Sequence, residues 1–243
     1  MATNQARSAR KANAGMFLGL LAGVTLAIGL YLGLVYAPED AVQGNAQRIF
    51  YIHVPMAWVA FLAFFVVFCA GIMFLWKRDL IWDQIARASA EIGLVFTTLV
   101  LLTGSFWGRP IWGTWWTWDA RLTTTLLLWF IYLSYFMLRA YAGERDRAAR
   151  FSAVIGIIGF IDVPIIYMSV DWWRTLHPGP VFTSSGAAMP NEMLIAMLVC
   201  LLGFTLLYVY LMILKFGIEE SKDKLLDYQF ALAEREAEGA ISA

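Results

Sequence analysis

Only two histidines, His53 and His177, occur in the 243 residues of this chain. Neutral imidazole is the commonest metal ligand among protein side chains. A zinc ion would need three or four ligands, and neither cysteine lies near a histidine in the sequence. Each histidine alone is typical of a hydrogen-bonded surface residue, whereas the pair predicts a metal with two axial nitrogen ligands.

The segment WGRPIWGTWWTWDARLT, residues 107–123, lies between the two histidines in the sequence. Indole offers a large flat apolar face and one N–H donor, so several indoles can hold a planar aromatic ligand. An interfacial tryptophan belt is the alternative, but a belt is spread over many helix ends. Because haem iron takes axial histidine, the two features together predict a haem site. Its aromatic wall would be Trp107, Trp112, Trp115, Trp116 and Trp118.

Arginine is the expected partner of the haem propionates, because guanidinium binds a carboxylate through two parallel hydrogen bonds. Arg174, three residues before His177, is equally suited to a lipid headgroup. The other candidates precede His53 or flank the tryptophans: Arg48, Arg109 and Arg121.

The composition predicts a polytopic helical membrane protein. Hydrophobic residues make up 60% of the chain, charged residues 15%, and the mean hydropathy is +0.66, against about 45–50% apolar and 25% charged residues in soluble domains. A spanning helix needs about 20 apolar residues. The first apolar run is too long for a cleavable signal peptide and is expected to be an uncleaved span. Six stretches qualify, at about 15–36, 54–76, 88–107, 121–141, 151–170 and 190–214.

Lysine and arginine predict the orientation of these six spans. One side would carry both termini and most basic residues, and the other only Arg48, Arg109, Arg121 and Arg174. The positive-inside rule then makes the termini cytoplasmic and the tryptophan-rich loop, between the third and fourth spans, periplasmic in a bacterial inner membrane. A formal net charge of zero gives no reason to expect a nucleic-acid partner. The basic side holds Arg7, Arg10, Lys11, Lys77, Arg78, Arg87, Arg139, Arg145, Arg147, Arg150, Lys215, Lys222, Lys224 and Arg235.

Three acidic residues are expected to have structural roles. Asp119 is suited to cap the fourth span, because Asp is a preferred N-cap residue, or to orient Arg121 or an indole N–H. Asp162 lies near the middle of the fifth span, where a carboxylate is costly, and is expected to join a polar network that supports the bundle. Glu91, four residues after Arg87, is expected to be ion-paired near the inner face.

The domain organisation is expected to be one membrane domain, residues 1–214, and a charged cytoplasmic tail, residues 215–243. Apolar residues at helical spacing in the tail predict an amphipathic or solvated helix. Cys69 and Cys200 both lie within predicted spans and are expected to act as small hydrophobic residues.

Three segments resemble the CcmC family of tryptophan-rich (WWD) haem-handling proteins: YIHVPMAW around His53, WGRPIWGTWWTWDARLT, and SVDWWRTLHPG around His177. The resemblance covers about residues 16–214. It implies that His53 and His177 ligate a non-covalent haem b, with the WWD segment against the porphyrin. It further implies delivery of haem to the chaperone CcmE during cytochrome c maturation. The implied partners are CcmD and the ABC transporter subunits CcmA and CcmB.

Two other functions remain alternatives. A cytochrome b-type electron-transfer subunit would hold a stable haem between histidines buried in facing spans. A secondary transporter would show repeated halves with broken helices at the midplane, and no repeat is visible. No catalytic constellation and no G-x-x-x-x-G-K-[ST] motif occurs, so the chain is expected to be a binding and delivery protein rather than an enzyme, with any ATP hydrolysis in a partner.

Overall fold

Six long helices make up almost the whole protein in this computed structural model, which describes residues 2–179, 182–183, 186–187 and 189–241. Within these residues, six helical segments are long and apolar enough to cross a membrane, which confirms the predicted all-helical membrane fold. The only sheet described is a hairpin of two short antiparallel strands, β1 (Phe182–Thr183) and β2 (Gly186–Ala187). The helices are α1 (Ala2–Tyr31), α2 (Phe50–Lys77), α3 (Leu80–Trp112), α4 (Ala120–Tyr141), α5 (Arg145–Trp172) and α6 (Asn191–Ile241).

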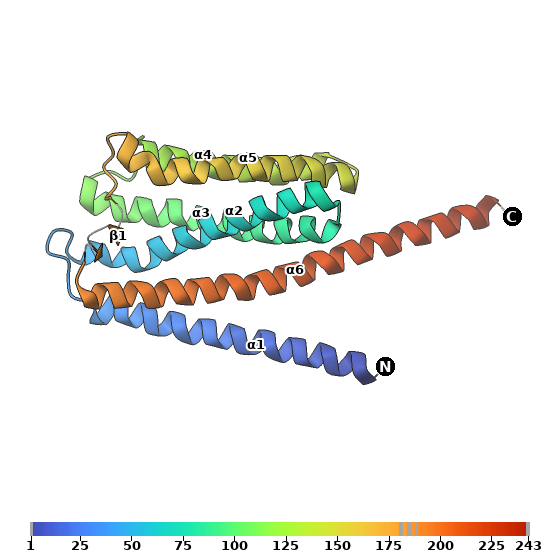
Figure 1. The fold of residues 1–243 in the computed structure, drawn as a ribbon, viewed down its shortest axis with the longest axis horizontal. Coiled ribbons are helices and arrows are strands. Elements are labelled where there is room, and N and C mark those ends of the chain that lie inside the picture. Colours follow the sequence, from blue (N-terminus) through green and yellow to red (C-terminus); the bar gives the residue numbers. More distant parts are fainter. Residues whose placement is uncertain (1, 180–181, 184–185, 188, 242–243) are drawn as a thin grey trace.

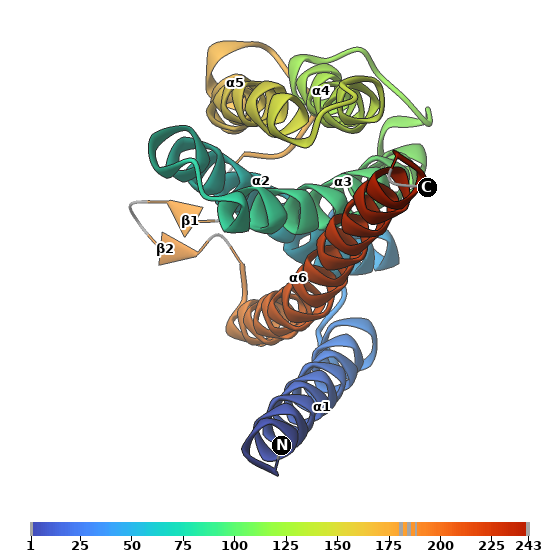
Figure 2. The same ribbon diagram turned by 90° about the vertical axis from the view of Figure 1, so that its right-hand side faces the viewer.

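The helices run roughly side by side, and successive helices run in opposite directions (Figure 1). Both ends of the chain lie at one end of the bundle, called here the terminal end. Residues 113–119 and the described residues of the connection between α5 and α6 lie at the opposite end, called here the site end. Viewed along the helices, α4 and α5 lie on one side of α2 and α3, while α6 lies on the other side with α1 outermost (Figure 2).

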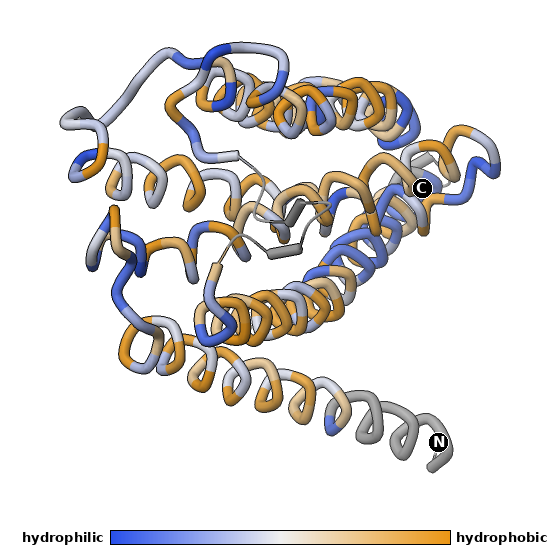
Figure 3. Tube along the Cα trace, turned by 60° about the vertical axis from the view of Figure 1, so that its left-hand side comes forward, coloured by the Kyte–Doolittle hydropathy of each residue, from blue (hydrophilic) through white to orange (hydrophobic). Residues whose placement is uncertain are grey.

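Hydropathy follows this arrangement. Apolar residues colour the middle of the helices, and hydrophilic residues gather in the loops and along the last part of α6 (Figure 3). This part continues α6 without a break past residue 215, so no change of backbone marks the expected boundary between the membrane domain and the tail. The tail is helical as predicted.

Helices α2 and α3 are among those that begin earlier than the spans predicted from the sequence. A 3₁₀ turn (Asn45–Ile49) leads into α2 at Phe50, which places Pro55 inside the helix and His53 in its first turn. His53 is therefore a helix residue, and not part of a loop. Helix α3 begins at Leu80 because Asp79 caps it, accepting a hydrogen bond from the Ile81 amide at 3.0 Å.

Helix α3 also ends later than predicted, at Trp112, so the first part of the tryptophan-rich segment is helical. Gly113 ends it with a left-handed φ of 75°, a conformation that glycine adopts without a steric penalty. Asp119 then caps α4 by accepting a hydrogen bond from the Leu122 amide at 3.0 Å, which confirms its predicted capping role.

Close packing of α2, α3, α4 and α5 forms the main core. The rings of Phe64 and Tyr132 stack with centroids 3.7 Å apart, and the Tyr132 hydroxyl donates to the Gly156 carbonyl at 3.0 Å. A Cβ at Gly93 would lie 2.5 Å from Phe64 Cε1, so only glycine allows this approach of α3 to α2.

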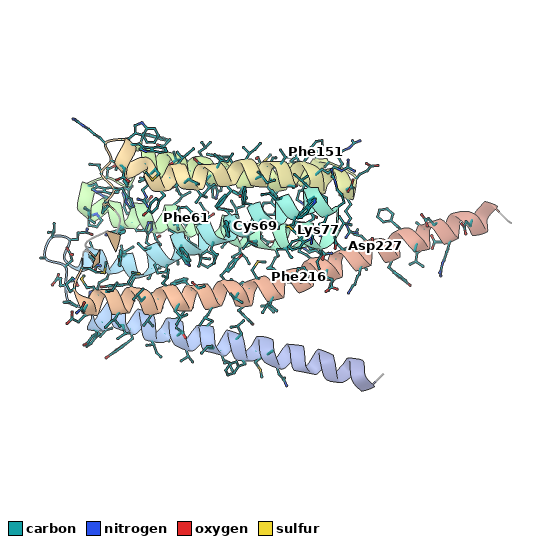
Figure 4. The ribbon with its side chains drawn as sticks, in the orientation of Figure 1. Phe61, Cys69, Lys77, Phe151, Phe216 and Asp227 are labelled. Carbon is teal, nitrogen blue, oxygen red and sulfur yellow. The ribbon has the colours of Figure 1, made fainter. Side chains whose placement is uncertain are left out.

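The two cysteines differ in environment. Cys200 is buried where α6 meets α1, close to Gly29, and fits its predicted role as a small hydrophobic residue. Cys69 is exposed on α2 instead of buried in the bundle. Figure 4 labels its position about midway along the bundle. It lies within a membrane-spanning segment, so lipid is its expected surrounding.

Buried ion pairs join the helices at the terminal end. Arg139 donates to both carboxylate oxygens of Asp83, at 2.7 and 2.9 Å. Arg87 pairs with Asp83, Glu219 and Asp223, linking α3 to the extended part of α6. These bonds hold the first turns of α3, residues 80–87, in the bundle, although the prediction from hydropathy left these residues outside a span.

Of two predictions about acidic residues, that for Glu91 is confirmed and that for Asp162 needs correction. Glu91 is ion-paired as predicted, but with Lys215 of α6 at 2.6 Å and not with Arg87 one turn away. Asp162 is buried and its Oδ2 has no hydrogen-bond partner among the described residues. The polar network expected around Asp162 is therefore not found in the part of the chain that the structure describes.

Candidate haem-binding site

A cavity of about 640 Å³ lies at the site end of the bundle and contains both histidines in its wall. Ligand cavities for small molecules and cofactors commonly measure about 300–1,000 Å³ and are mostly apolar with a few polar groups. Helices α2, α3, α4 and α5 supply most of the wall, and α6, the connection after α5 and residues 42–43 before α2 complete it. The polar or aromatic lining residues are Gln43, His53, Trp58, Phe61, Thr97, Ser105, Trp107, Trp112, Trp116, Arg121, Thr125, Tyr167 and His177.

His53 is held in one tautomer by its partner on α3. Its Nδ1 lies 2.9 Å from Thr103 Oγ1, and that hydroxyl donates its only proton to the Leu99 carbonyl at 2.7 Å. Thr103 must therefore accept, so Nδ1 of His53 carries the proton and Nε2 keeps its lone pair. Gly104 makes room for the ring, since a Cβ there would lie 3.1 Å from Cε1.

His177 reaches the same tautomer by a different route. Its Nδ1 lies 2.9 Å from the carbonyl oxygen of Pro178, which can only accept, so Nδ1 is again protonated. Burial, followed by the positive charge of Arg121, lowers the pKa of His177 to about 4. The imidazole is therefore neutral at neutral pH, with the lone pair of Nε2 free to bind a metal.

Three of the five predicted tryptophans line the cavity: Trp107, Trp112 and Trp116. Trp107 packs edge-on to His53 with centroids 5.6 Å apart and donates to Gln43 Oε1 at 3.0 Å. Trp116 Nε1 is buried without a hydrogen-bond partner among the described residues. An unused donor in the wall of a cavity is suited to a polar atom of a ligand.

The other two tryptophans lie outside the cavity and are exposed. Trp115 is 54% exposed and Trp118 is 76% exposed. Trp118 contacts Trp116 edge-on at 5.6 Å, and Trp115 contacts Phe106 in the same way at 5.5 Å. The WWD segment therefore has an inner set that lines the cavity and an outer set that extends its aromatic surface outward.

Of the four arginines considered for the propionates, Arg121 alone is a lining residue of this cavity. Within the described residues, its guanidinium makes no hydrogen bond or ion pair. Arg109 donates to the Gly113 carbonyl and lies over the Trp115 ring. Arg48 donates to the Gly33 carbonyl at 3.0 Å and to Asn45, and Arg174 is exposed.

Asp119 supports the site from outside the cavity wall. Its Oδ2 accepts a hydrogen bond from Thr175 Oγ1 at 2.9 Å, and the same hydroxyl accepts from the His177 amide at 3.1 Å. The capped start of α4 is thereby tied to the connection that carries His177. Part of the remaining connection, at 180–181, 184–185 and 188, lies outside the described residues.

Sequence reasoning did not identify Thr103, Thr175 or Gln43, which hold His53, His177 and Trp107. Thr175 is two residues before His177, a spacing at which a hydroxyl bonds a backbone amide, so the sequence contained a signal for it. Thr103 lies 50 residues from His53 in an apolar span, and nothing in the local pattern marks it.

The fold defines a multi-pass helical membrane protein, and it has a cavity of ligand size at one end of its bundle. Comparison with known proteins is more specific. The CcmC family, heme exporter protein C, matches residues 2–226, and the chain therefore belongs to this family. A heme exporter protein C of Bradyrhizobium diazoefficiens is 43% identical over 88% of this chain and 81% of its own length. One of Haemophilus influenzae is 38% identical over 82% of each.

Proposed function

We propose that this protein holds haem b non-covalently, with His53 and His177 as the two iron ligands, and delivers it during cytochrome c maturation. Its relatives named heme exporter protein C support a role in haem export. The recipient is the haem chaperone CcmE, and the working complex includes CcmD and the ABC transporter subunits CcmA and CcmB. The protein binds and presents haem without catalysing a reaction, and ATP hydrolysis belongs to the transporter.

The observation that carries this proposal is the matched state of the two histidines. Both line one cavity, and both use Nδ1–H as a donor to a fixed oxygen. A histidine that ligates a metal through one ring nitrogen commonly donates a hydrogen bond from the N–H of the other. This bond fixes the ring and raises the basicity of the ligating nitrogen. The donor set therefore fits an iron with two axial imidazoles.

The rest of the wall fits the other parts of haem. Trp107, Trp112 and Trp116 offer flat apolar surface for the porphyrin. Arg121, which makes no ion pair within the described part of the chain, offers a cation in a partly buried position, where a propionate would form charge-assisted hydrogen bonds. Bound haem supplies iron as the acceptor of both imidazole lone pairs, and the chain supplies the positioning.

The orientation proposed for the complex follows the charge distribution. The terminal end carries most of the lysine and arginine, so it faces the cytoplasm, and the site end faces the periplasm of a bacterial inner membrane. His53 lies in a helix, whereas His177 lies in a connection. We therefore expect ligation at His177 to change first when CcmE docks.

Absorption spectroscopy of the protein purified in mild detergent tests the ligand assignment. Wild type should show a bis-histidine haem spectrum. His53→Ala or His177→Ala should lower haem retention, and added imidazole should partly restore the spectrum of each single variant by filling the vacant position. Unchanged haem content and spectrum in the double variant would refute the assignment. Reversible redox cycling of a haem that never exchanges would favour the electron-transfer alternative.

Site-directed crosslinking tests the docking face and the orientation together. In a Cys69→Ala background, a crosslinker at Thr114→Cys, between the tryptophans, should capture CcmE. The same reagent at Arg147→Cys, at the terminal end, should not. Capture from the terminal end alone would contradict both the proposed orientation and delivery from the site end.

A further inference from the structure

The cavity reaches the flank of the bundle. Two residues in its wall, Trp58 and Tyr167, are 47% and 52% exposed although both lie within membrane-spanning segments. A side chain that lines a cavity and is also half exposed lies at the edge of an opening. Because the exposed flank of a spanning helix faces lipid, this opening faces the bilayer.

Trp58 and Tyr167 belong to α2 and α5, which lie side by side (Figure 2). The indole of Trp58 is fixed on the far side of the opening, because Nε1 donates to Thr205 Oγ1 of α6 at 3.2 Å. The Thr205 hydroxyl uses its own proton on the Leu201 carbonyl, so it can only accept from the indole. Val54, Phe61 and Val170 of the same two helices continue the cavity wall beside the opening.

The depth of the opening sets it in the outer part of the bilayer. Trp58 is eight residues beyond the start of α2 and Tyr167 is five residues before the end of α5. At 1.5 Å per residue these are about 12 and 8 Å below the helix ends, within a hydrocarbon core of about 30 Å. Arg121, in contrast, is the second residue of α4 and lies at the site end itself.

The polar group of the cavity therefore lies near the membrane surface and its apolar groups lie deeper, which matches the polar propionates and the apolar porphyrin of haem. A haem lying edge-on in the outer leaflet keeps its propionates near the headgroups and its porphyrin in the acyl chains. The cavity has a cation at headgroup level and an aromatic, apolar opening below it. A sideways move brings the propionates toward Arg121 without passing them through hydrocarbon.

We propose that haem enters and leaves the cavity laterally, from the outer leaflet, through the opening framed by Trp58 and Tyr167. The inference rests on the proposed haem function and adds the source of the cargo and its route. A haem already dissolved in lipid needs no aqueous step, and the amphipathic rings of Trp and Tyr are the side chains typical of such an interface. The same opening would also admit a lipid acyl chain, and uptake kinetics distinguish the two.

The test is haem uptake from haem-loaded vesicles by haem-free protein in nanodiscs, followed by the change in the haem absorption band. In a Cys69→Ala background, Tyr167→Cys is labelled with a bulky maleimide. Ile161→Cys, on the lipid-exposed face of α5 and outside the cavity wall, is the matched control. We expect the label at position 167 to slow uptake at least tenfold and the label at 161 to leave the rate within twofold. Protein labelled at 161 should reach the same final spectrum as unlabelled protein.

Unslowed uptake with the label at 167, beside a normal bis-histidine spectrum, would overturn the lateral route and leave the haem site intact. Unslowed uptake is also the result expected if the opening admits only lipid acyl chains and haem reaches the cavity by another route. A second variant, Trp58→Ala, removes the tethered indole and should speed both uptake and loss of haem several-fold. Failure of unlabelled protein to give any bis-histidine spectrum would instead count against the proposed function.

Discussion

Asp119 and Thr175 connect the two loops that build the site end. The Thr175 hydroxyl donates to Asp119 Oδ2 at 2.9 Å, while Asp119 Oδ1 accepts from the Leu122 amide. One carboxylate thus caps α4 and anchors the connection that carries His177. The position of His177 therefore depends, through Thr175, on a residue of the tryptophan-rich segment that lies 56 positions from Thr175.

Removing the Thr175 hydroxyl should loosen His177 and leave the α4 cap intact. We expect Thr175→Val to cost about 1 kcal/mol of haem binding, roughly fivefold in retention, because the valine cannot bond Asp119 or the His177 amide. Thr175→Ser keeps both bonds and should behave like wild type. Haem per protein after gel filtration measures the effect, and equal loss in the two variants would mean that the hydroxyl does not position His177.

The cavity arginine should matter more than its exposed neighbour. Arg121→Gln should weaken haem binding about 10- to 100-fold, the range for losing a hydrogen bond to a charged group. Arg109→Gln should have little effect, because the Arg109 side chain donates to the Gly113 carbonyl and lies over the Trp115 ring. Titration with a haem whose propionates are esterified provides the control: wild type and Arg121→Gln should then bind alike.

The inner tryptophans should contribute to haem retention, and the outer tryptophans to haem transfer. Trp112→Ala and Trp116→Ala, in the cavity wall, should each lower haem retention roughly two- to tenfold, the range for one aromatic contact. Trp115→Ala and Trp118→Ala should keep haem and slow its transfer to CcmE. Haem content and transfer rate measured on the same preparations test this division. Uniform behaviour of all four variants would indicate an interfacial belt.

The buried ion pairs at the terminal end should support stability without affecting haem. Asp83→Asn leaves Arg139 without its buried counter-charge, while Arg87 keeps Glu219 and Asp223, and should cost about 3–5 kcal/mol in unfolding free energy. Asp146→Asn removes an exposed pair with Arg150 and should cost less than about 1 kcal/mol. Thermal unfolding in detergent compares the two, and the haem spectrum of folded Asp83→Asn should match wild type. A melting temperature equal in both variants would contradict the stabilising role.

The sequence alone determined the class and the residue types of the site. Hydropathy over about 20 residues defines a membrane span without tertiary information, so all six helices were predicted. Asp119 was expected as a cap because N-capping is a local bond within four residues. The histidines and tryptophans were identified because their rarity and clustering are visible in one dimension.

Only the tertiary structure decided how these residues are shared between the cavity and the surface. Arg109 and Arg121 are equivalent in the sequence, yet one folds back on its own helix end and the other faces the cavity. Glu91 pairs with Lys215 of α6 and not with Arg87, because the packing of α3 against α6 brings Lys215 Nζ within 2.6 Å of Glu91 Oε2. The contact of Thr103 with His53, which sets the tautomer of the imidazole, also results from the packing of two helices, α2 and α3. Contacts between helices depend on which faces meet, and no local pattern of residues encodes that.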